Sequence, residues 1–74
     1  MTLLLRTNDL VLISAVEAIL SDAKIEYLVA DTHMSAVEGS VGAIPRRVMV
    51  ETNALDRARK LLTEAGLGHA LAKN

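Results

Sequence analysis

Residues 2–30, TLLLRTNDLVLISAVEAILSDAKIEYLVA, decide the fold, because two short apolar runs flank a stretch with a helical repeat. The run at 2–6 is short and is followed by Thr7-Asn8-Asp9, so we expect a strand that is buried on both faces or nearly so. Apolar residues then recur at spacings of three and four through 9–23, which predicts an amphipathic helix. Residues 25–30 are β-branched or aromatic at alternate positions, which predicts a second strand.

The ends of this first helix carry recognisable signals. Asn8 or Asp9 places a short oxygen acceptor just ahead of the periodic run, as an N-cap residue does. Lys24 lies in the last turn or just past it, where a cation interacts favourably with the negative end of the helix. The apolar stripe of the helix is expected to consist of Leu12, Val16, Ile19, Leu20 and Ala23, widened by Val11, Ala15 and Ala18.

A long connection separates this unit from a third strand. Residues 31–45 hold two of the four glycines and the only proline, and they show no clear period. Residues 46–51 are predicted to form a strand in which Val48 and Val50 lie on the same face. Arg46 and Arg47 are adjacent in this strand, so we expect them to point to opposite faces.

A second helix is predicted after this strand. Asn53 is its expected N-cap, and Gly66 is its expected end, with Leu67 placed to contact Leu62 in a Schellman-type stop. The expected apolar stripe of this helix is Leu55, Ala58, Leu61, Leu62 and Ala65.

The order strand, helix, strand, long loop, strand, helix predicts an α+β fold. We expect a ferredoxin-like βαββα sandwich, in which an antiparallel three-stranded sheet carries two helices on one face. Residues 1–74 are expected to be a single domain with a weak tail at 67–74. Only 67–72 could supply a fourth strand, and these residues are poor strand formers, so the first strand is expected to be an open edge. Covering of that edge by a second copy is a physical reason to expect a homodimer.

Composition argues against several classes of partner. The chain has no cysteine, and therefore neither a disulfide framework nor a thiolate metal site. Eight basic and nine acidic residues are spread along the chain, and Tyr27 is the only aromatic residue, which argues against a nucleic-acid surface. No apolar run approaches the roughly 18–20 residues of a membrane span, and no basic segment precedes the first apolar run. We therefore expect a cytoplasmic protein that binds neither nucleic acid nor membrane.

A pattern shared with a known family runs through five segments: Leu5 to Asp9, Leu20 to Ile25, Asp31 to Gly39, Gly42 to Val50 and Ala58 to Leu62. They resemble a family of small bacterial domains of unknown function, described as putative prokaryotic signal-transducing proteins, over about residues 3 to 66. The similarity is most specific at Met34-Ser35, Glu38-Gly39, Gly42 and Pro45-Arg46-Arg47.

The resemblance implies a ferredoxin-like fold related in shape to PII-type regulators. It implies no established ligand, reaction or catalytic residue. The chain departs from the family pattern at Leu10 and Lys24, where members often have proline and glycine. Both places still accept a helix start and a helix stop, so the expected fold is unchanged.

The long connection and the strand after it contain the candidate binding residues. Gly39-Ser40-Val41-Gly42 can expose backbone N–H groups to an anion, and the guanidinium forks of the two arginines that follow suit phosphate or carboxylate. A connection this long is unusual in so small a domain and is more often functional than not. The predicted ligand-binding residues are Asp31, His33, Ser35, Glu38, Gly39, Gly42, Arg46 and Arg47.

These residues predict a regulatory binding module, not an enzyme, that binds a small anionic ligand or a protein partner through residues 31–47 without a cofactor. Two alternatives stay open: a metal-dependent domain with Asp31, His33 and Glu38 as ligands, and a purely structural dimerisation module. Ser35, His33 and Asp31 are also the residue types of a hydrolytic triad. They lie on one loop without a nucleophile-elbow pattern, so no catalytic residue is assigned.

Overall fold

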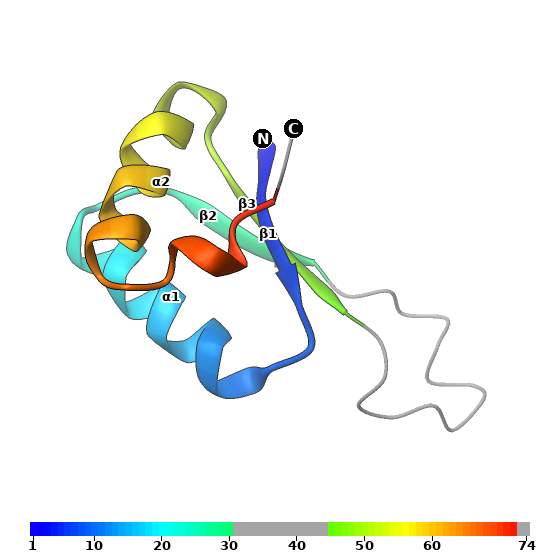
Figure 1. Ribbon diagram of the computed structural model, residues 1–74. Helices are drawn as coiled ribbons and strands as arrows, with labels where there is room; N and C mark the ends of the chain where they lie inside the picture. Colours follow the sequence, from blue (N-terminus) through cyan, green and yellow to red (C-terminus); the bar gives the residue numbers. More distant parts are fainter. Residues whose placement is uncertain (31–44, 73–74) are drawn as a thin grey trace.

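The computed structural model describes residues 1–30 and 45–72 and has an α+β fold. Its elements are β1 (Thr2–Thr7), α1 (Leu10–Asp22), β2 (Tyr27–Ala30), β3 (Arg46–Val50), η2 (Thr52–Ala54), α2 (Leu55–Glu64) and η3 (Gly68–Ala70). Both α-helices lie on the same side of the sheet (Figure 1). No helix in the described ranges is long and apolar enough to span a membrane.

The three strands form one antiparallel sheet in the order β1-β3-β2. β3 lies in the middle and is antiparallel to both neighbours, so β1 and β2 are parallel to each other and α1 connects them. The predicted three-stranded antiparallel sheet with two helices is therefore confirmed.

The core lies between the sheet and the helices, and the buried residues of the described part are all aliphatic. No polar or charged residue of the described part is buried. Full burial of a leucine or valine side chain contributes about 1.5–3 kcal/mol, so these residues supply most of the stability of the domain. The buried residues are Leu4, Leu5, Ile13, Val16, Leu20, Ile25, Val48, Val50, Ala58 and Leu62.

An irregularity in β1 explains how its run of leucines is used. Leu3 pairs with Met49 and Leu5 pairs with Val48, so Leu4 is an extra residue in the strand, as in a β-bulge. Regular alternation would send Leu4 and Leu5 to opposite faces, but both have no exposed surface. Burial on both faces was therefore the wrong expectation. The helices cover one face only, and the bulge lets two successive leucines reach it.

The N-terminus of α1 is capped by Asp9. Its Oδ1 accepts hydrogen bonds from the backbone N–H groups of Val11 and Leu12, at 2.9 and 3.2 Å. The backbone N–H of Asp9 in turn donates to Thr7 Oγ1 at 3.1 Å. Of the two predicted cap residues, Asp9 therefore has this role.

The C-terminus of α1 is a Schellman stop with an unusual residue. The N–H of Ile25 donates to the carbonyl of Leu20 at 2.9 Å, and that of Lys24 donates to Ser21 at 3.0 Å. Lys24 has a φ of 60°, in the left-handed region where glycine is usual. Lys24, at a position where members of the resembled family often have glycine, thus retains the helix stop. Its backbone conformation is less favourable for a residue with a side chain than for glycine.

The buried stripe of α1 is narrower than predicted. Val16 and Leu20 are buried, and Ile13, which was not predicted to be in the stripe, is 6% exposed. The prediction that three further residues widen the stripe is wrong, because α1 contacts the core on one narrow face only and these residues are exposed. These exposed residues are Val11, Ala15 and Ala18.

α2 starts differently from the prediction and ends as predicted. The chain enters it through η2, and the N-cap Ala54 makes no side-chain cap, so Asn53 is not the cap residue. At the other end Gly66 has a φ of 84°, and the N–H of Leu67 donates to the carbonyl of Leu62 at 2.8 Å. The Schellman-type stop at Gly66 is confirmed.

The tail after α2 returns to the outer edge of β1 (Figure 1). Leu71 forms an isolated antiparallel bridge with Leu5, and the N–H of Ala72 donates to the carbonyl of Leu4 at 2.9 Å. Arg59 Nη1 donates to the carbonyl of Ala72 at 3.4 Å. The expectation of an open β1 edge is wrong over this length, and a dimer through this part of the edge is therefore no longer expected.

Candidate functional site

Two of the predicted binding residues, Arg46 and Arg47, belong to the described part of the chain. The others lie outside the described residues: Asp31, His33, Ser35, Glu38, Gly39 and Gly42. The three metal ligands of the alternative interpretation are among them. Within residues 1–30 and 45–72, no three His, Cys, Asp or Glu side chains come together as a metal-binding group.

Arg46 and Arg47 point to opposite faces of the sheet, as predicted. Arg46 pairs with Thr7 and is partly buried on the side of the helices. Arg47 pairs with Arg6, is exposed, and shares its face with Met49. We call this second surface, which carries no helix of residues 1–30 and 45–72, the helix-free face.

Arg6 belongs to the site although its position in the sequence did not single it out. The register places Arg6 directly opposite Arg47 on the central strand, and both side chains are exposed. Opposed side chains in an antiparallel pair have Cβ atoms about 4.5–5.5 Å apart, and like charges there are destabilising. In the described part of the chain, no carboxylate is paired with either guanidinium. The bulge in β1 sets this register, which is why local sequence signals could not reveal the pair.

The helix-free face is organised in three rows that run across β1, β3 and β2 in that order. The basic row consists of Arg6, Arg47 and Ala30. The apolar row consists of Leu3, Met49 and Leu28. The third row, one residue beyond each strand, consists of Met1, Glu51 and Glu26, and we call it the acidic row after its two glutamates.

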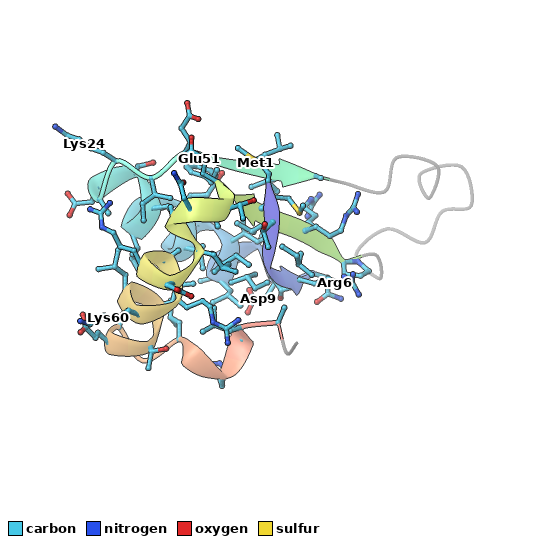
Figure 2. The ribbon with its side chains drawn as sticks, turned by 90° about the horizontal axis from the view of Figure 1, so that it is seen from above. Met1, Arg6, Asp9, Lys24, Glu51 and Lys60 are labelled. Carbon is cyan, nitrogen blue, oxygen red and sulfur yellow. The ribbon has the colours of Figure 1, made fainter. Side chains whose placement is uncertain are left out.

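The acidic row follows from the continuation of the strand pairing. The N–H of Glu51 donates to the carbonyl of Glu26 at 3.3 Å, which extends the β2–β3 pairing by one residue. The neighbours of these glutamates, Tyr27 and Val50, face the core, so the glutamates face the other way. Both glutamates are exposed. Figure 2 shows Glu51 near Met1 and well separated from Arg6.

The basic row lies at the end of the sheet where β2 finishes at Ala30 and β3 begins at Arg46. Each guanidinium presents several N–H donors in a planar fork, a geometry that matches carboxylate and phosphate oxygens. Arg6 and Arg47 are both accessible on this face, so one anionic group can accept from both. The arrangement is suited to binding an anion.

Comparison with known proteins gives one result at the level of the family. No protein with a curated description matches the chain. A family model described as "Putative prokaryotic signal transducing protein" matches residues 1–66. The match runs from β1 to Gly66 at the end of α2, and the tail that lies beside β1 is outside it. The chain therefore belongs to the family described as putative prokaryotic signal transducing protein.

Proposed function

We propose that this chain is a regulatory binding module in signal transduction, not an enzyme, and that it binds an anionic group at its basic row. The observation that carries the proposal is the direct opposition of Arg6 and Arg47 on an exposed face. The family description supports a signalling role. The arginine pair supports the chemical class of what is bound.

The electrostatics of the pair favour occupation by an anion. Two like charges on directly opposed strand positions repel, and an anion between them converts that repulsion into two charge-assisted interactions. Guanidinium groups stay protonated at neutral pH, so the row supplies charge and hydrogen-bond donors instead of acid–base chemistry. These properties suit a binding site.

The proposal extends to the architecture. The strand order β1-β3-β2, with the tail beside β1 in the place of a fourth strand, supports a ferredoxin-like arrangement. Such an arrangement is related in shape to PII-type regulators, as the family resemblance implies. A rigid sheet that carries binding residues at one end suits a module that responds to a ligand or a partner.

Binding of small anions tests the proposal. We expect inorganic phosphate, ATP or citrate to raise the melting temperature of the purified chain, and calorimetry to give a dissociation constant for the anion that does so. Arg47→Ala and Arg6→Ala should each weaken that binding at least tenfold. Lys60→Ala is the matched control, because Lys60 is an exposed cation on α2 (Figure 2), and it should bind as the wild type does. Equal anion affinity of Arg47→Ala and wild type would contradict the proposal.

A further inference from the structure

We infer that the helix-free face binds a second copy of this chain, face to face, about a twofold axis that passes close to Met49. The inference rests on the proposed function, because it takes Arg47 as a residue that binds an anionic group. In this dimer, the anionic group that Arg47 binds is the Glu51 carboxylate of the second copy.

The apolar row is the first reason to expect a partner on this face. Leu3, Met49 and Leu28 lie side by side across the three strands, and Leu28 is 54% exposed. None of the three packs against the core, and both helices lie on the other side of the sheet (Figure 1). Met1, 57% exposed, adds to this apolar surface at the acidic end. Leu3 and Met49 are partly exposed, and adjoining apolar side chains with a charged rim are typical of an interaction surface.

The symmetry of the charges identifies the partner. On β3 and its next residue, Arg47, Met49 and Glu51 follow one another at alternate positions of the same face. A rotation of 180° about an axis across the strand at Met49 places this methionine over its own copy. The same rotation places Arg47 over Glu51 of the partner subunit, and the reverse pair forms at the other end. In a twofold dimer, residue i of one copy contacts residue j of the other copy, and residue j of the first contacts residue i of the second.

The neighbouring strands carry further charges beside this central pair. Arg6 adds a second positive charge beside Arg47, and Glu26 adds a second negative charge beside Glu51. Each like-charged pair is unfavourable in the isolated chain. Twofold docking places β1 over β1 and β2 over β2 of the second copy, so Arg47 meets Glu51 of the partner subunit directly, whereas Arg6 and Glu26 are diagonal neighbours of that contact. Packed sheets lie about 10 Å apart, a separation that arginine and glutamate side chains can bridge at the rim of the contact.

The structure also sets the expected strength of the dimer. The sheet has three short strands spaced about 4.8 Å apart, so its face is small and belongs at the low end of specific interfaces. We therefore expect a dissociation constant in the micromolar range. The tail beside β1 covers part of that edge, so we place the contact on the face, where the charge pattern is self-complementary.

Charge exchange between Arg47 and Glu51 tests the inference. Sedimentation velocity of the full chain over a micromolar concentration series should show a monomer–dimer equilibrium for the wild type. Arg47→Glu and Glu51→Arg should each weaken the homodimer at least tenfold, because like charges then face each other. An equimolar mixture of the two variants should recover the dimer, and so should the double variant. Lys60→Glu is the control, since it reverses an exposed charge on α2, and it should leave the equilibrium unchanged.

A second pair of variants keeps the test independent of charge reversal. Leu28→Ser should weaken the dimer, whereas Val11→Ser should not, although Val11 is 79% exposed on α1.

A wild-type chain that stays monomeric at all concentrations would overturn the inference. A dimer that Arg47→Glu does not weaken would also overturn the inference. Pairing through the outer edge of β2 would give that result. A monomer that binds an anion through Arg47 overturns the dimer and leaves the proposed function standing. A dimer rescued by the exchange, without any anion binding, supports the dimer and removes the small-ligand part of the proposed function.

Discussion

Lys24 holds a backbone conformation that L-residues rarely adopt, with a φ of 60° at the end of α1. The left-handed conformation costs a residue with a side chain roughly 1–2 kcal/mol, and glycine avoids this cost. We therefore expect Lys24→Gly to increase the free energy of unfolding by about 1 kcal/mol, which corresponds to about 4–8 °C in melting temperature for a domain of this size.

Thermal and urea unfolding check the prediction for Lys24. Lys24→Ala is its control, because alanine retains the unfavourable conformation and removes only an exposed side chain. A glycine variant that is no more stable than the alanine variant would show that the Schellman stop is not under strain.

Asp9 is the second residue whose contribution can be isolated. Its carboxylate accepts hydrogen bonds from two N–H groups that have no partner within the helix. Asp9→Ala should lower the free energy of unfolding by about 1 kcal/mol, measured by urea unfolding. Asp9→Asn retains an oxygen acceptor and should lose much less. If the alanine variant were as stable as the wild type, the capping role would be refuted.

Among the elements, β1 depends most on an irregularity. Leu4 and Leu5 are both fully buried because of the bulge. Leu4→Ala and Leu5→Ala should therefore each destabilise the chain by about 2–5 kcal/mol, or unfold it outright, in urea titrations followed by circular dichroism. Leu3→Ala removes a partly exposed side chain on the helix-free face and should cost clearly less. A regular strand would give the alternating result, with Leu3 and Leu5 behaving alike, and that result would rule out the bulge.

The elements also show how far local sequence reasoning reaches. The apolar periods, the cap at Asp9 and the glycine at 66 predicted the order of strands and helices, because these signals act within a few residues. The start of α2 was missed because the chain enters through η2, whose turn bonds replace an Asn53 side-chain cap. The docking of the tail on β1 was also missed, since a contact of Leu71 with Leu5 depends on tertiary packing and not on strand propensity.

Local sequence signals also revealed only part of the candidate site. The opposite orientation of Arg46 and Arg47 follows from alternation along one strand and was predicted. The pairing of Arg47 with Arg6 depends on the register between strands that are far apart in sequence, and the bulge shifts that register by one residue. The acidic row has the same origin. A charge pattern that is unremarkable in sequence thus becomes an ordered surface only when the sheet forms.

In the whole molecule, we propose that Arg6 and Arg47 act together as an anion site at one end of the helix-free face. NMR titration of the isotope-labelled chain with inorganic phosphate, ATP and citrate tests this most directly. We predict that the anion that binds shifts the side-chain Nε–H signals of Arg6 and Arg47 together, with one common dissociation constant, while Arg57 and Arg59 on α2 stay unchanged. Equal shifts at all arginines, or none at Arg6 and Arg47 at saturating anion, would contradict it.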